Sequence, residues 1–177
     1  MGSELAAAVG ERLRTTRRDR GLSLGALAEA AGVGKGSLSE IENGSRNATL
    51  GTLYALAGAL EVPLATLLAE RVGAEVSSPG ISARLLETQH LEEGVVEVYL
   101  LHLDAGARHE SPGHGRGVVE HFLVTRGRAS VGPLRRTVEV GVGETAVWDS
   151  RGRHGYRALG DGPVDAVLVI RSRGIVS

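Results

Sequence analysis

The sequence predicts a two-domain α+β protein, with an all-α domain of five helices over residues 1–70, a linker over 71–80 and an all-β barrel over 81–177. Up to about residue 70, apolar residues recur every three or four positions, which is the pattern of the buried face of a helix. From Ile81 onward, apolar and polar positions alternate and turn residues separate the runs, as in a set of short strands. The segment between them loses this periodicity and contains Ser-Ser-Pro-Gly, which favours a linker.

The composition excludes several classes of protein. The chain has 20 basic and 21 acidic residues, so any nucleic-acid binding must come from a local surface rather than from overall charge. The absence of cysteine excludes disulfides, thiolate metal sites and thiol nucleophiles. The sequence contains no apolar run of membrane-spanning length and no signal-peptide core, so we expect a cytoplasmic protein with no membrane partner.

The first three predicted helices form a helix-turn-helix pattern. A first helix over 4–20 has an apolar face and an arginine-rich face. Ser23 suits the N-cap of a second helix, and the glycine-rich segment 32–34 breaks that helix. A third helix over 35–43 ends at Gly44. Two short helices joined by such a turn are typical of proteins that insert the second helix into the DNA major groove.

Two further helices complete the domain. Thr49 suits the N-cap of a fourth helix, which carries a stripe of leucine and alanine. Val62 and Pro63 begin the last helix, because proline suits a first helical turn. We interpret the leucines and alanines of both helices as core residues.

The run L-x-x-L-A-x-x-x-G-V-x-x-x-x-L-S-x-I-E-N-G, from Leu24 to Gly44, resembles the XRE family of phage-repressor-like DNA-binding regulators. Residues 10–70 follow that family's five-helix plan, so the resemblance implies binding of double-stranded DNA. It also implies an ion pair between Arg17 and Glu42, which we interpret as structural.

The expected DNA-contacting residues lie on the third helix and in the segments that flank it. Lys35 can donate to guanine, Glu40 can accept from cytosine, and Arg46 suits a phosphate contact. Because Gly34 and Gly36 carry no side chain to read bases, we expect a homodimer on a roughly palindromic site. The full set is Ser23, Lys35, Gly36, Ser37, Ser39, Glu40, Asn43, Arg46, Asn47 and Thr49.

Eight short strands are expected in the second half of the chain, and their number and spacing predict a small barrel or jelly roll. The turns between them are rich in glycine and proline. The strands are expected over 81–87, 95–103, 118–125, 128–131, 137–140, 145–148, 155–158 and 164–170.

The order of glycine, histidine and glutamate in this region resembles the two signatures of the cupin family. Gly106, His114, Glu120 and Gly127 match the first signature, and Gly143 with His154 match the second. The resemblance implies a barrel in which His114, Glu120 and His154 can hold a divalent transition metal.

Arg116 stands where the first cupin signature has its second histidine. An offset of four residues from Glu120 predicts that both side chains point into the barrel and form an ion pair. We expect this pair, together with His154, to hold a small polar or anionic effector without a cofactor. A bound divalent transition metal remains the alternative.

Phe122 and Val124 share the strand face of Glu120, and Trp148 can stack on a ligand, so we expect a small-molecule pocket. Its predicted lining is His114, Arg116, Glu120, Phe122, Val124, Trp148 and His154. We assign no catalytic residue and favour a transcriptional regulator whose barrel senses a small molecule. Two alternatives remain: a metal-dependent oxygenase or isomerase fused to a DNA-binding domain, and a DNA-binding module whose barrel only dimerises.

Overall fold

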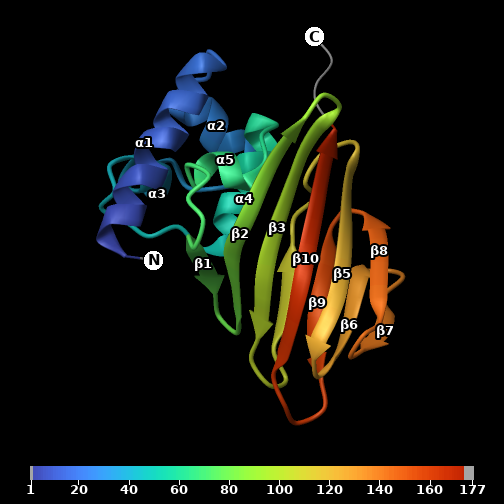
Figure 1. Ribbon diagram of the computed structural model, residues 1–177. Coiled ribbons are helices and arrows are strands. Elements are labelled where there is room, and N and C mark those ends of the chain that lie inside the picture. Colours follow the sequence, from blue (N-terminus) through green and yellow to red (C-terminus); the bar gives the residue numbers. More distant parts are fainter. Residues whose placement is uncertain (1, 174–177) are drawn as a thin grey trace.

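The computed structural model describes residues 2–173, and within this range five helices precede ten strands (Figure 1). The helices are α1 (Ser3–Asp19), α2 (Leu24–Ala30), α3 (Lys35–Glu42), α4 (Leu50–Leu60) and α5 (Leu64–Leu67). The five-helix prediction is confirmed, with ends that differ by one or two residues. None of the helices within residues 2–173 is long and apolar enough to cross a membrane.

The strands form two antiparallel sheets that enclose the barrel core. The larger sheet has the order β1-β2-β3-β10-β5-β8 and the smaller one β4-β9-β6-β7. Inward-facing residues of both sheets, such as Tyr99, Phe122 and Leu168, are fully buried. The strand bounds are β1 (Glu75–Ser78), β2 (Ile81–Leu91), β3 (Gly94–Leu103), β4 (Arg108–Ser111), β5 (Val118–Arg126), β6 (Arg128–Pro133), β7 (Val138–Gly141), β8 (Thr145–Asp149), β9 (His154–Leu159) and β10 (Val164–Arg173).

The predicted linker over 71–80 is partly wrong, because β1 lies inside it. β1 pairs with the start of β2 across a turn in which Gly80 has a positive φ of 76°. Val76 is the one fully buried residue of this strand, so the sequence shows no run of alternating residues there. The sequence also missed β4, which is equally short. The first strand of the barrel therefore follows the helical domain almost directly.

The predicted ion pair between Arg17 and Glu42 is confirmed. The Arg17 Nε and Nη2 atoms donate to the two Glu42 carboxylate oxygens at 2.6 and 2.9 Å. Arg17 Nη1 also donates to the Leu22 carbonyl at 2.9 Å. This guanidinium therefore ties together α1, the turn before α2 and the end of α3, and so fixes the position of the third helix.

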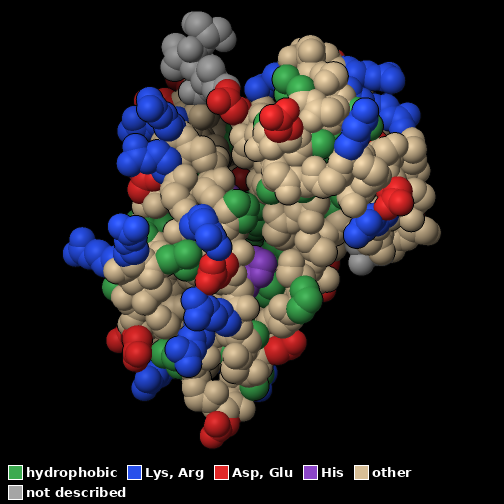
Figure 2. All heavy atoms as spheres, turned by 180° about the vertical axis from the view of Figure 1, so that it is seen from behind, with side chains coloured by type: hydrophobic (Ala, Val, Ile, Leu, Met, Phe, Trp, Pro, Cys, Tyr) green, Lys and Arg blue, Asp and Glu red, His purple; other side chains and the backbone are tan. Residues whose placement is uncertain are grey.

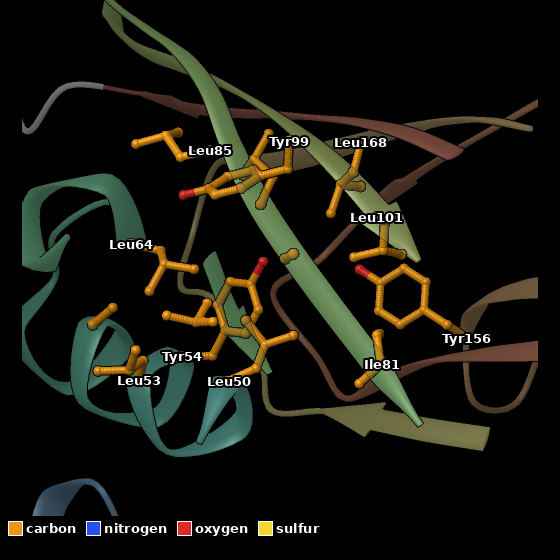
Figure 3. Packing of buried hydrophobic residues seen from close by; sticks show 14 of the residues in the cluster. Leu50, Leu53, Tyr54, Leu64, Ile81, Leu85, Tyr99, Leu101, Tyr156 and Leu168 are labelled. Carbon is orange, nitrogen blue, oxygen red and sulfur yellow. The ribbon is translucent and has the colours of Figure 1, made fainter. Parts of the chain in front are cut away.

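The helical domain packs directly on the barrel, and the two share one hydrophobic core. Figure 3 shows Leu50, Tyr54 and Leu64 of the helices on the side that faces the strand residues Ile81, Leu85 and Tyr99. From behind, the two parts meet along a seam in the middle of the view and are separated by a gap above it, and basic side chains lie along the outer side of the helical domain (Figure 2). A change in the barrel wall at this seam would therefore reach the helices.

A buried carboxylate reinforces the seam. Glu97 of β3 is 1% exposed, and its Oε1 atom accepts hydrogen bonds from the Ala65 backbone N–H at 2.6 Å and the Tyr99 hydroxyl at 2.7 Å. Burial raises the pKa of Glu97 to about 7, although both hydrogen bonds oppose the rise. The carboxylate thus links α5 to the barrel and titrates near neutral pH.

Candidate functional site

The exposed side of α3 is the candidate DNA-reading surface. Leu38 and Ile41 are buried against the helical core, which turns Lys35, Gly36 and Glu40 to the solvent. Ser37 and Ser39 lie half-buried between the two sides. An α-helix with one free face of this kind fits the width of the major groove.

Arg46 lies beside the exposed face of α3. Its Nη1 atom donates to Glu40 Oε2 at 3.1 Å and to Ser37 Oγ at 3.2 Å. The side chains of Arg46 and Glu40 are each 55% exposed, so the pair is open to a nucleic acid. The loop after α3 therefore extends the candidate surface, and phosphate contact by Arg46 stays a prediction.

The remaining predicted DNA contacts have structural partners in this protein. The Ser23 and Thr49 hydroxyls accept from the Ala26 and Thr52 backbone N–H groups and so cap α2 and α4. Asn43 accepts a hydrogen bond from Arg14, and Asn47 lies exposed in the same loop as Arg46. The two capped helix ends also present backbone N–H groups of the kind that bind phosphates.

Three of the predicted barrel residues meet inside the barrel. Glu120 Oε1 of β5 lies 3.0 Å from His114 Nε2 and 3.1 Å from His154 Nε2, and one ligand atom from each residue lies within 4.8 Å of the others. Glu120 and His154 are fully buried, and the His114 side chain is 7% exposed. The β5 and β9 strands position two members, and the segment before β5 positions His114.

The three donor atoms lie close together in the barrel interior. Although the distances are short, none of these atoms makes a contact with hydrogen-bond geometry. Two imidazole nitrogens and one carboxylate oxygen are also the donor set that divalent transition metals prefer. Such orphaned buried atoms fit a metal ion, and His114, Glu120 and His154 are the residues that would hold it.

Neighbouring groups hold this set in place. The Tyr156 hydroxyl donates to Glu120 Oε2, and His154 Nδ1 lies 3.0 Å from the Gly152 carbonyl, which leaves Nε2 of His154 free to act as a ligand. Burial by itself would raise the pKa of Glu120, but the two histidines outweigh it and hold that pKa well below its usual value. Burial by itself would lower the pKa of His154, but the hydrogen bond to Glu120 and the charge of Glu120 outweigh it, so the pKa of His154 is raised.

The prediction that Arg116 pairs with Glu120 inside the barrel is wrong. Arg116 lies exposed in a turn before β5, between Gly115 and Gly117, which have φ values of 103° and 74°. Alternation of side chains holds only within an extended strand, and β5 begins at Val118. The carboxylate therefore faces two histidines and a tyrosine instead of a guanidinium.

The residues predicted to line a small-molecule pocket pack closely on one another. Phe122, Val124 and Trp148 are buried as expected, but the aromatic rings pack on one another and on His154, with Trp148 and His154 centroids 6.0 Å apart. A separate cavity of about 20 Å³, room for roughly one water molecule, lies on the other side of His114 and is lined by residues such as Tyr54 and Glu97, but not by Glu120 or His154. An organic ligand of larger size would require movement of the wall.

Tyr54 of α4 covers the site, although its position in the sequence is that of an ordinary core residue. Its ring stacks on His114 with centroids 4.2 Å apart and an interplanar angle of 28°. Its buried hydroxyl makes no hydrogen bond within the described residues. Close approach is possible because Gly58, one turn further along α4, has no side chain: a Cβ there would lie 3.2 Å from the Gly113 carbonyl. The site is thus completed by a residue of the helical domain.

Comparisons with known proteins agree with both halves of the structure. A family model described as "Helix-turn-helix" (HTH_3) matches residues 13–67. The HTH-type transcriptional regulator SutR of Escherichia coli (strain K12) is 33% identical over 120 residues, which cover 66% of this chain and 67% of that protein.

Two solved structures are also similar. An HTH_3 family transcriptional regulator from Vibrio cholerae has a TM-score of 0.85 and 26% identity, and the match covers 96% of this chain and 98% of that one. The Cupin_2 domain of an XRE family transcriptional regulator from Enterobacter cloacae has a TM-score of 0.48 and 20% identity over 52% of this chain and 97% of that one. The similarity to the Vibrio cholerae protein therefore extends across both domains.

Proposed function

Because this chain belongs to the XRE-type (HTH_3) family of helix-turn-helix transcriptional regulators, we propose that it binds a specific DNA sequence and that its barrel senses a ligand at His114, Glu120 and His154. The chain is a DNA-binding transcriptional regulator with a cupin-like domain. The observation that carries the sensing proposal is the stack of Tyr54, a residue of the helical domain, on His114. A cytoplasmic location follows from such a role.

The DNA complex that we propose is a homodimer on a two-fold site. A single α3 presents few side chains that can read bases, since Gly36 lies on its exposed side and Glu40 is already paired with Arg46. Two copies on half-sites about one helical turn apart would supply the missing sequence information.

Base reading by Lys35 can be separated from phosphate binding by Arg46. Lys35→Ala should change the preferred base at one position and cost about 1–3 kcal/mol there, because a specific donor is lost. Arg46→Ala should weaken binding to all sequences alike and reduce the salt slope by about one. Binding-site selection and salt titrations of the full chain measure both effects. An unaltered consensus for the Lys35 variant would contradict its assignment.

The ligand that fits the barrel site as it stands is a divalent transition metal ion. The site offers two imidazoles and a carboxylate whose ligand atoms lie within 4.8 Å of one another, a spacing that suits a single ion. When bound, such an ion would act as a Lewis acid that can accept a further small polar ligand. The buried wall and the regulator relatives favour sensing, so we propose no enzymatic activity.

The signal would pass through the contact between Tyr54 and His114. Ligand binding fixes the orientation of a coordinating imidazole. Because the Tyr54 ring stacks on His114, a shift of His114 on ligand binding would act directly on Tyr54. Tyr54 belongs to α4, which also packs on α2, the helix that precedes the turn to α3. Occupancy of the barrel and the position of the reading helix are therefore physically connected.

Metal titrations of the full chain test this proposal. We expect zinc or manganese to bind with a stoichiometry of one per chain and to change DNA affinity. Glu120→Gln, which removes a charged ligand, should weaken metal binding by about 100-fold or more. His90→Ala, on an exposed histidine outside the site, is the matched control and should bind as the parent does.

The coupling step has its own variant. Tyr54→Ala should still bind the metal but should lose the effect of the metal on DNA affinity, because the contact to His114 is gone. Calorimetry for the metal and fluorescence anisotropy for labelled DNA measure the two quantities separately. A Tyr54 variant in which the metal still changes DNA affinity would exclude this route.

A further inference from the structure

The outer face of the six-stranded sheet carries an apolar patch. Figure 1 shows this face turned away from the helices, and no described helix or strand of residues 2–173 lies over it. Leu123 is 37% exposed and Val147 is 57% exposed. The members used below are Val98, Leu100, Leu123, Val147, Val167 and Val169.

These residues are contiguous because they occupy adjacent positions across the sheet. Val167 of β10 is opposite Leu100 on one side and Leu123 on the other. Val169 is likewise opposite Val98 and His121, and His121 is opposite Val147 of β8. All share the outward side of the pleat, since the alternate residues face the buried core. The patch is therefore a continuous surface and not a set of scattered side chains.

The size of the face fits a protein interface. Five strands spaced by about 4.8 Å and about nine residues long give a face of roughly 24 by 30 Å. Its area of about 700 Å² approaches the roughly 800 Å² that each partner buries in a standard interface. The apolar residues occupy the middle of this face, on β3, β10, β5 and β8, and charged side chains of β10 lie at its two ends.

The charges at the two ends of β10 make this face complementary to itself. Along its outward side β10 reads Asp165, Val167, Val169 and Arg171, so an acid and a base flank the apolar pair. Asp165 contacts His102 at 2.6 Å and Arg126 at 3.8 Å, whereas Arg171 forms no ion pair within the described residues. A two-fold axis that passes near Leu168, perpendicular to β10 and in the plane of the contact, would place the two β10 strands in opposite directions. Arg171 of each copy would then lie opposite the acidic end of the other β10.

We infer that two copies of this chain associate through this face, with β10 of each crossing the other in reversed direction. Val167 then packs on Val169 of the partner subunit, and Arg171 meets Asp165 of the partner subunit. A two-fold contact of this type is isologous and closes after two copies, as most soluble homodimers do. The inference rests on the homodimer proposed above and assigns its surface.

The oligomeric state of the full chain tests this assignment. We expect a dimer by sedimentation equilibrium at tens of micromolar, and we expect Val169→Arg to raise the dissociation constant by about 100-fold, because a charge would be buried at its centre. Val142→Arg is the matched control: Val142 is 65% exposed but lies in the turn between β7 and β8, outside the face. Circular dichroism confirms that both variants fold.

A charge exchange tests the proposed two-fold axis. Asp165→Arg and Arg171→Asp should each weaken the dimer, and the double variant should dimerise more tightly than Asp165→Arg alone, because the pairs across the axis re-form with reversed charge while the loss of the contacts to His102 and Arg126 is common to both. A dimer that Val169→Arg leaves intact would overturn the surface while keeping the homodimer. A parent protein that is monomeric at these concentrations would overturn the surface and the proposed homodimer together.

Discussion

Arg17→Ala should lower the free energy of unfolding of the helical domain by about 3 kcal/mol or more, because it leaves the Glu42 carboxylate buried without its main partner. The Glu42 side chain is 4% exposed and receives two hydrogen bonds from Arg17. The interaction with Glu42 also raises the pKa of Arg17, in keeping with a stabilising contact. Denaturant unfolding of the full chain, followed by circular dichroism, measures the loss.

Arg14 provides the matched control for this variant. Its Nε atom lies 3.7 Å from the same carboxylate, but its side chain is 38% exposed. Arg14→Ala should therefore cost about 1 kcal/mol or less. The double variant Arg17→Met with Glu42→Leu should recover most of the stability, since no unpaired charge remains buried. A loss for Arg17→Ala no greater than that for Arg14→Ala would contradict the structural role of the pair.

Glu97→Gln should remove a pH dependence of stability that the parent protein shows between about pH 4.5 and 7. The pKa of Glu97 is raised from 4.5 to about 7 in the folded chain. The folded state therefore holds this proton over a range in which the unfolded state releases it, so stability falls as the pH rises. The shift corresponds to a loss of about 3 kcal/mol by pH 8.

The difference between the pH profiles of the parent and of Glu97→Gln isolates the contribution of the Glu97 carboxyl group from that of other titrating groups. His154 also has a raised pKa, and its contribution likewise falls as the pH rises, but it is common to parent and variant. Glutamine keeps an oxygen that can accept from Ala65 and Tyr99 without ionising. Unfolding curves from pH 4 to 8 measure the effect. Parallel pH profiles for the two proteins would show that Glu97 keeps its ordinary pKa.

Local signals predicted the helical domain well because they are contained within a few residues. Ser23 and Thr49 cap the helices that the sequence assigns to them, and Gly21 and Gly44 have the positive φ values of helix ends. By contrast, the sequence predicts a linker where β1 lies, because a strand of four residues with a single buried side chain has almost no pattern of its own. Pairing with β2 stabilises it, and pairing partners are not visible in a local window.

The sequence likewise predicts part of the candidate site correctly and part of it wrongly. The cupin-like spacing identified His114, Glu120 and His154, which the fold brings within 4.8 Å of one another. The expectation for Arg116 failed because strand parity was applied to a residue that lies in a turn.

The sequence by itself determined which domains this protein has and which barrel residues can act as ligands, because capping, periodicity and motif spacing are properties of neighbouring residues. Only the tertiary structure decided what surrounds those ligands. Tyr54 lies sixty positions before His114 in a helix that reads as ordinary core, and docking of α4 on the barrel places its ring over the site. The side chains that meet across such an interface depend on how two complete surfaces pack, which no local pattern in the sequence records.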